Sequence, residues 1–201
     1  MPKIKICGIT RLEEIQAVNE ARPDFCGFII EVEKSSRCVS REQVRILTKE
    51  LNPGIIPVGV FVNAPMELPA RLLQNGIIGI AQLHGKEDED YIKKLRRITN
   101  KPVIKAFSIK TKEDIIKALA SSADYILFDQ GSGGTGKTFD WSLIPGIERP
   151  FFLAGGLGES NLKEAVETVN PWAVDLSSSL ETEGKKDREK ILKAVECVRN
   201  L

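Results

Sequence analysis

The sequence predicts an α/β protein in which residues 1–201 form a single (β/α)8 barrel, also called a TIM barrel. Eight short apolar runs alternate with eight segments of helical periodicity, and such alternation is typical of parallel strands joined by helical crossovers. The runs begin 21 to 32 residues apart and are rich in Ile, Val and Phe, as expected of strands covered on both faces. The alternative, an open doubly wound sheet, usually has only about five or six strands.

The expected strands and helices follow each other in strict order. The strands are predicted at 3–7, 24–30, 56–62, 78–83, 103–107, 124–129, 150–154 and 172–176. The helices are predicted at 11–21, 41–50, 65–75, 87–99, 112–120, 140–146, 159–169 and 187–200. A capping box, in which a Ser or Thr precedes an acidic or amide residue by three positions, marks the start of three helices: Thr10 with Glu13, Ser40 with Gln43, and Thr111 with Asp114. Asn75-Gly76 and Asn170-Pro171 are typical of helix ends.

Charge and composition exclude several classes of function. The 201 residues carry 29 basic and 28 acidic side chains, for a net charge of +1, so no electrostatic argument supports binding to nucleic acid or to an anionic membrane surface. No apolar run approaches the roughly 20 residues that span a bilayer, and the first residues lack the pattern of a signal peptide, which predicts a cytoplasmic protein. The four cysteines include no C-x-x-C pair and there is one histidine, so we expect no metal site.

The first strand ends at Cys7, a candidate base or nucleophile. Side chains alternate along a strand, so Lys5 and Cys7 share the face opposite Ile4 and Ile6, and we expect that face to point into the barrel. Active sites of such barrels lie at the carboxyl ends of the strands, where a neighbouring cation can lower the pKa of a thiol; a packed cysteine at a strand end is the alternative. A buried Lys5 needs a counter-ion, and since the eighth strand adjoins the first in a closed barrel, we predict a contact between Lys5 and Asp175.

The sixth strand ends in a carboxylate, Asp129. Burial at the barrel mouth would raise its pKa and suit it to general acid catalysis; an Asp that caps a turn is the alternative. The next segment, 131–138, reads GSGGTGKT and matches the P-loop pattern G-x-x-x-x-G-K-[ST]. A P-loop opens a regular helix that holds phosphate, whereas Pro145 shortens the helix predicted here. Nucleotide binding is therefore one interpretation, and a mobile glycine-rich lid over the barrel mouth is the other.

Two further loops carry the residues of a phosphate site. Gly155 and Gly156 follow the seventh strand, and Ser178 and Ser179 follow the eighth. Loops at these two positions of a barrel commonly bind phosphate through backbone N–H groups, and glycine permits close approach. Two tight turns without a ligand are the alternative.

Three more side chains fall at strand ends. Arg37, after the second strand, could clamp a substrate carboxylate with its two-pronged guanidinium, although a solvated loop Arg is the alternative. Gln82 and His84 share the inward parity of the fourth strand, where either a substrate contact or a structural hydrogen bond would explain them.

Together these residues resemble the phosphoribosylanthranilate isomerase family of tryptophan biosynthesis. The matching segments are KICGIT at 5–10, GVFVN at 59–63, QLHG at 82–85, GGTGKTFDW at 133–141, AGGL at 154–157 and AVDLSS at 173–178. The resemblance extends from the first strand to about residue 187 and therefore covers nearly the whole chain. It favours the glycine-rich lid over a nucleotide site.

The resemblance implies an Amadori rearrangement of N-(5-phosphoribosyl)anthranilate to 1-(o-carboxyphenylamino)-1-deoxyribulose 5-phosphate, without metal or cofactor. It implies that Cys7 is the general base that removes the proton from C2′, and that Asp129 is the general acid that protonates the ring oxygen. Arg37 would hold the anthranilate carboxylate, and the loops with Gly155-Gly156 and Ser178-Ser179 would grip the phosphate. The implied partner is a small phosphorylated substrate, and the chain would be a monomer or a homodimer.

Two other functions remain open on the sequence. A related sugar isomerase of histidine biosynthesis performs the same type of reaction, but it uses paired aspartates, and Cys7 argues against it. A non-catalytic phosphate-binding barrel is the second, because Glu31-Val32-Glu33 replaces an aromatic, proline-containing stretch that usually precedes Arg37 in the family.

Overall fold

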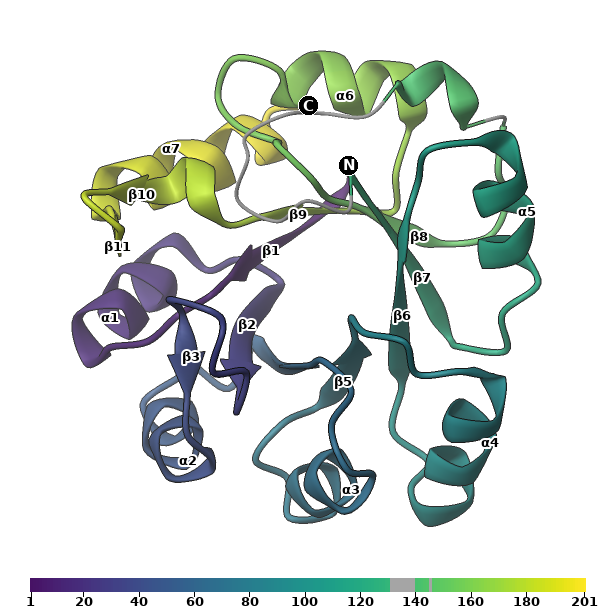
Figure 1. Cartoon of the computed structure of the whole chain (residues 1–201). Coiled ribbons are helices and arrows are strands. Elements are labelled where there is room, and N and C mark those ends of the chain that lie inside the picture. The colour runs from purple at the N-terminus through teal and green to yellow at the C-terminus, as the bar shows by residue number, and fades with distance from the viewer. Residues whose placement is uncertain (131–139, 145) are drawn as a thin grey trace.

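The computed structural model describes residues 1–130, 140–144 and 146–201. Within these ranges, eight parallel strands close into a barrel with helices on its outside (Figure 1). The barrel strands are β1 (Lys3–Cys7), β2 (Phe25–Ile30), β4 (Ile56–Phe61), β5 (Ile80–Leu83), β6 (Val103–Ser108), β7 (Tyr125–Asp129), β8 (Phe151–Leu153) and β9 (Ala173–Leu176). Strand β1 pairs with both β2 and β9, which closes the ring. The predicted barrel is therefore confirmed, and the open sheet is excluded.

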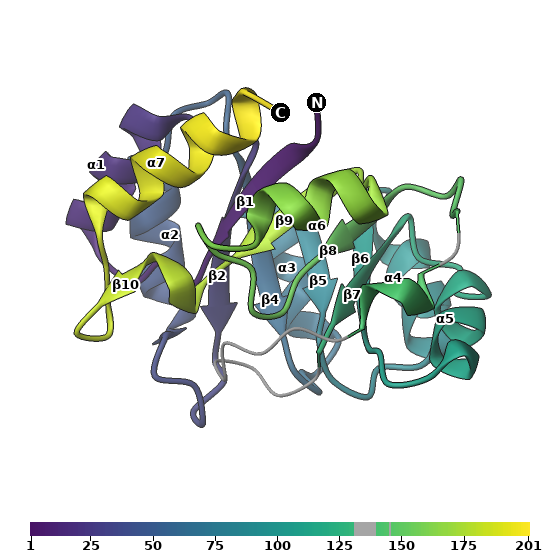
Figure 2. The same cartoon turned by 90° about the horizontal axis from the view of Figure 1, so that it is seen from above.

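Seven α-helices surround the barrel in the described part of the chain. They are α1 (Leu12–Ala21), α2 (Arg41–Lys49), α3 (Glu67–Gln74), α4 (Glu89–Ile98), α5 (Lys112–Leu119), α6 (Leu162–Val169) and α7 (Arg188–Arg199). Helix α7 packs beside α1 in both views, so the first and last helices close the outer ring (Figures 1 and 2). None of the helices in the described ranges is long and apolar enough to cross a membrane.

Local chemistry changes the helix predicted at 140–146 and the start of the helix predicted at 11–21. The helix expected at 140–146 is a single 3-10 turn, η1 (Trp141–Leu143), because Pro145 disfavours a helical conformation in the residue before it. The capping boxes predicted before α2 and α5 are formed. Before α1, Glu14 rather than Glu13 accepts hydrogen bonds from the backbone of Thr10 and Arg11, because the helix begins one residue later than expected.

Aromatic side chains fill the amino-terminal end of the barrel interior. Phe25, Tyr125, Phe152 and Trp172 pack with ring centroids 4.7 to 5.9 Å apart. A second apolar layer lies between the strands and the helices, because alternate residues of each strand face opposite sides. The aromatic cluster closes the bottom of the barrel, so the opposite end is the one open to a ligand.

Short elements that the sequence pattern did not predict lie near that open end. Strand β3 (Cys38–Val39) extends the sheet beside β2, and a 3-10 turn, η2 (Ser178–Leu180), follows β9. The antiparallel hairpin of β10 (Glu181–Thr182) and β11 (Lys185–Lys186) comes next. Its two turn residues, Glu183 and Gly184, have φ of 51° and 74°, as a two-residue hairpin turn requires.

Candidate active site

A pocket of about 470 Å³ opens at the carboxyl ends of the strands. Eight of the nine predicted site residues line it: Cys7, Arg37, Gln82, His84, Asp129, Gly155, Gly156 and Ser178. Ser179 departs from the expectation, since its side chain is exposed and does not line the pocket. The cause is the η2 turn, in which successive side chains point about 120° apart, so that Ser179 faces Gly158 instead.

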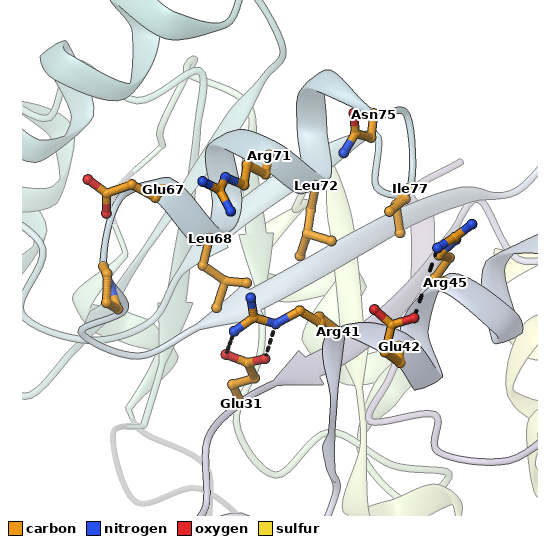
Figure 3. A pocket seen from close by; sticks show the side chains of 11 residues that line it. Glu31, Arg41, Glu42, Arg45, Glu67, Leu68, Arg71, Leu72, Asn75 and Ile77 are labelled. Carbon is orange, nitrogen blue, oxygen red and sulfur yellow. Dashed lines mark hydrogen bonds and ion pairs between the residues drawn. The ribbon is translucent and has the colours of Figure 1, made fainter.

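A second pocket, of about 620 Å³, lies on the outside of the barrel between α2 and α3 (Figure 3). An ion pair between Arg41 and Glu31 crosses one side of it, at 2.6 Å from Nε to Oε1. None of the predicted site residues lines this pocket. Because barrel active sites lie at the carboxyl ends of the strands, the smaller pocket is the candidate active site.

Beneath Cys7, the predicted ion pair between Lys5 and Asp175 is formed. The Lys5 Nζ lies 2.8 Å from Asp175 Oδ2, and both side chains are buried. Burial alone would lower the pKa of the Lys5 ammonium, but the charges and hydrogen bonds of Asp175 and Cys7 together more than offset this and raise the pKa. Lys5 therefore remains a cation inside the barrel, on the same face as Cys7.

The cations near Cys7 do not lower its pKa below the ordinary value, contrary to the expectation. Burial raises the pKa of the thiol, and Lys5, followed by Lys186, only partly opposes this. The charge of Asp175 adds to the rise. The neutral thiol is therefore the favoured form of Cys7 in the free protein, because the loss of water around a thiolate costs more than the two lysines restore.

Asp129 belongs to a chain of three hydrogen-bonded side chains across the pocket. His84 Nε2 lies 3.1 Å from Asp129 Oδ2, and His84 Nδ1 lies 3.0 Å from the amide nitrogen of Gln82. The backbone N–H of Gln130 donates to the other oxygen of Asp129 at 2.7 Å. Gly155 permits this arrangement, since its φ is +86° and a Cβ there would lie 2.7 Å from Asp129 Oδ1.

Arg37 does present its two-pronged edge to a carboxylate, but that carboxylate belongs to the protein. Its Nε and Nη2 donate to the two oxygens of Glu181 at 2.5 and 2.7 Å. The Nζ of Lys186 lies 2.5 Å from Glu181 as well and donates to the backbone oxygen of Ser177. Gly8 makes room for Arg37, because a Cβ at Gly8 would lie 2.6 Å from its Cδ.

Sequence reasoning missed Glu181 and Lys186. The available signal was the run ETEGKK, in which two charged segments flank a Glu-Gly pair shortly after the last barrel strand. A Gly at a turn between short polar segments favours a hairpin, and this hairpin brings Lys186 beneath Ser177, whose hydroxyl donates to the backbone oxygen of Cys7 at 3.0 Å. The missed residues thus connect the Arg37 side of the pocket to Cys7.

The loops after β8 and β9 contribute backbone groups, rather than charged side chains, to the lining of the pocket. Gly155 and Gly156 both have positive φ, of 86° and 68°, and they line the pocket with Ser177 and Ser178. The described residues contain no group of three or more His, Cys, Asp or Glu side chains that could hold a metal ion. The segment 131–138 that matches the P-loop pattern lies outside the described residues.

Comparison with known proteins gives one consistent family. The sequence profile for N-(5'phosphoribosyl)anthranilate isomerase matches residues 4–197. The N-(5'-phosphoribosyl)anthranilate isomerase of Endomicrobium trichonymphae is 44% identical over 205 residues, which cover 100% of both chains.

Two solved structures agree with that match. A phosphoribosyl anthranilate isomerase in complex with reduced 1-(o-carboxyphenylamino)-1-deoxyribulose 5-phosphate superposes with a TM-score of 0.88, at 36% identity over 100% of both chains. Monomers generated from the dimeric isomerase of Thermotoga maritima superpose with a TM-score of 0.87, at 35% identity over 100% of both chains. With its closed barrel, its strand-end pocket and these relatives, the chain belongs to the N-(5'-phosphoribosyl)anthranilate isomerase family.

Proposed function

We propose that Cys7 and Asp129 carry out the Amadori rearrangement of N-(5'-phosphoribosyl)anthranilate in this chain, as general base and general acid. As a member of its family, the chain is an isomerase of tryptophan biosynthesis. The observation that supports the two roles is that both side chains line one pocket from well-separated strands of the ring, β1 and β7. A substrate between them can be protonated on one side and deprotonated on the other.

The reaction needs two proton transfers. Asp129 gives a proton to the furanose ring oxygen while the aniline nitrogen forms a double bond to C1′, which opens the ring. Cys7 then takes the proton from C2′, and the electron pair of that C–H bond moves toward nitrogen to give an enolamine. Its tautomerisation yields the ketone product. Each transfer is a step to which a well-placed acid or base contributes a factor of about 10²–10⁴.

Arg37 is the proposed ligand of the anthranilate carboxylate. Glu181 indicates that a carboxylate fits the edge of Arg37, and Lys186 can neutralise Glu181 when a substrate carboxylate takes up that edge. The backbone of Gly155, Gly156 and Ser178 forms the proposed phosphate grip. Such two-point binding would hold the sugar between acid and base, where positioning contributes much of the rate.

Loss of the acid or the base tests the two roles directly. We expect Cys7→Ser and Asp129→Asn each to lower kcat by about 10²–10⁴ and to fail in complementing a tryptophan auxotroph that lacks this isomerase. Cys197→Ser, in α7 and outside the pocket, is the matched control and should behave as the wild type. Near-normal turnover of either variant on purified substrate would refute the corresponding assignment.

Removal of the carboxylate clamp should act on affinity instead. Arg37→Ala is expected to raise KM while kcat changes less, because the lost contact holds the anthranilate carboxylate, which neither gains nor loses a proton in the reaction. Arg37→Lys should restore only part of the affinity, since an ammonium cannot form the two-pronged contact. An unchanged KM in Arg37→Ala would contradict the proposed clamp.

A cytoplasmic location and a monomeric or homodimeric state belong to the same proposal. All four cysteines are unpaired, as is usual in a reducing compartment. Light scattering of the purified chain and fractionation of the producing cells would test the two points.

A further inference from the structure

The inward parity of Gln82 and His84 suggested contact with the substrate, but their hydrogen bonds lead to Asp129. The Gln82 side chain is 1% exposed at the core of β5, and its amide nitrogen lies 3.0 Å from His84 Nδ1. His84 Nε2 in turn lies 3.1 Å from Asp129 Oδ2. Each of the two residues is thus placed to act on the reaction through the proposed general acid.

We propose that His84 and Gln82 are positioning residues that govern the proton on Asp129. Gln82 sets which ring nitrogen of His84 carries a proton, and His84 thereby decides whether Asp129 presents a carboxylate or a carboxylic acid to the pocket. This inference rests on the proposed role of Asp129 as general acid.

In the arrangement observed, the hydrogen bonds from His84 and Gln130 fit an ionised Asp129. An amide nitrogen only donates, so His84 Nδ1 must accept, and the ring proton then lies on Nε2. That proton is donated to Asp129 Oδ2, while the other oxygen accepts from the backbone N–H of Gln130. In these two hydrogen bonds each oxygen of Asp129 accepts, as the oxygens of a carboxylate do.

A rotation of the Gln82 amide would give hydrogen bonds that fit a protonated Asp129. The amide oxygen of Gln82 is buried and has no hydrogen-bond partner among the described residues. If the amide turns by about 180°, this oxygen can accept a proton from His84 Nδ1, and Nε2 is free to accept one from Asp129. One additional proton is then shared by His84 and Asp129, which is what a general acid must hold before ring opening.

The loop around His84 keeps the ring in place while its proton moves. Lys105 Nζ donates hydrogen bonds to the backbone oxygens of Leu83 and Gly85, the residues on either side of His84, at 3.4 and 2.7 Å. Glu87 accepts from the backbone N–H of Gly85 at 2.8 Å. The His84 side chain itself is 33% exposed, so solvent can return the proton after each turnover.

The sequence offers an unusually direct test, because His84 is the only histidine. In untagged protein labelled with ¹⁵N in histidine, every ring signal comes from this residue. We expect the substrate-free wild type to show a neutral ring protonated on Nε2. In Gln82→Met the signal of Nδ1 should shift, because its donor is gone. In Gln82→Glu the ring lies between two carboxylates, and we expect protons on both nitrogens. Identical ring spectra in all three proteins would overturn the inference.

Kinetics separate positioning from substrate binding. We expect Gln82→Met and His84→Asn to lower kcat by about tenfold or more, with KM changed by less than about threefold. Gln74→Met, on the exposed face of α3, is the matched control and should leave both constants unchanged. A raised KM with unchanged kcat would overturn the inference and assign the two residues to the substrate. The NMR result does not depend on turnover, so it stands or falls separately from the roles of Cys7 and Asp129.

Discussion

Cys7 lies near two lysines and yet holds its proton more tightly than a free thiol does. The barrel removes water from the thiol, and this outweighs the charges of Lys5 and Lys186. A base of this kind is active only in its minor, ionised fraction. The cations still matter, because each of them increases that fraction.

The pH dependence of the reaction should expose this balance. A general base works when deprotonated, and the pKa of Cys7 lies above its ordinary value. In Asp129→Asn the proposed acid no longer titrates, so the residual kcat/KM of this variant is expected to rise through neutrality into the alkaline range. Measurement of the variant from about pH 6 to about pH 10 with purified substrate would show the rise, and a profile already flat at neutral pH would contradict a Cys7 base with a raised pKa.

The buried pair of Lys5 and Asp175 makes a prediction about stability. Lys5→Met leaves the Asp175 carboxylate buried without its cation, and breaking such a pair costs about 3–5 kcal/mol. We expect the midpoint of urea unfolding to fall accordingly. Adding Asp175→Asn should recover part of the loss, since an amide carries no charge to be neutralised; a loss below about 1 kcal/mol in the single variant would argue against a fully desolvated pair.

At the scale of elements, the β10–β11 hairpin gives one side of the pocket its charges. Its first residue, Glu181, pairs with its last, Lys186, at the open end of the hairpin, and these two side chains determine how Arg37 is held. The length of the hairpin depends on a two-residue turn with left-handed backbone at both positions. A change in the turn should therefore alter the position of the Arg37 side chain.

Gly184→Val tests that connection. A Cβ at Gly184 meets nothing within 4 Å, so the substitution adds only backbone strain, about 1–2 kcal/mol for a left-handed residue with a side chain. We expect KM to rise severalfold while kcat changes little, as the hairpin no longer fixes Arg37. Gly54→Ala, where φ is not left-handed and contacts are ordinary, is the control. Equal effects of the two substitutions on KM would contradict the role of the turn.

For the molecule as a whole, the aromatic packing of the barrel interior and the proposed chemistry lie at opposite ends of the barrel. The aromatic cluster closes the amino-terminal end, and the pocket opens at the other. This separation is general in such barrels, where carboxyl-end loops vary with function while the interior supports the fold. It predicts that interior truncations far from the pocket reduce stability without a specific effect on turnover.

Phe152→Ala is the corresponding experiment. The side chain is fully buried in the cluster, and truncation of a buried phenylalanine costs about 3–5 kcal/mol. We expect a lower free energy of unfolding in urea, together with wild-type kcat at a temperature well below the new midpoint. A large loss of kcat in the folded variant would show that the cluster also shapes the pocket.

The sequence by itself determined the order of strands and helices and the side of each strand that faces inward. Both depend on local patterns. Because side chains alternate between the two faces of a strand, Lys5, Cys7 and Gln82 were predicted to face inward. The eightfold repeat of strand and helix is compatible with few folds other than a closed barrel. The capping residues were predictable to within one position, because a cap depends on only a few neighbours.

Only the tertiary structure decided the partner of Arg37 and the ionisation of Cys7. Glu181 lies 144 residues beyond Arg37, and no local pattern reports a contact over such a separation. The pKa of Cys7 depends on how much water the assembled barrel excludes, and burial and nearby charges act on it in opposite directions. The sign of that balance is a property of the closed structure, since it is set by all the strands and loops that surround the thiol.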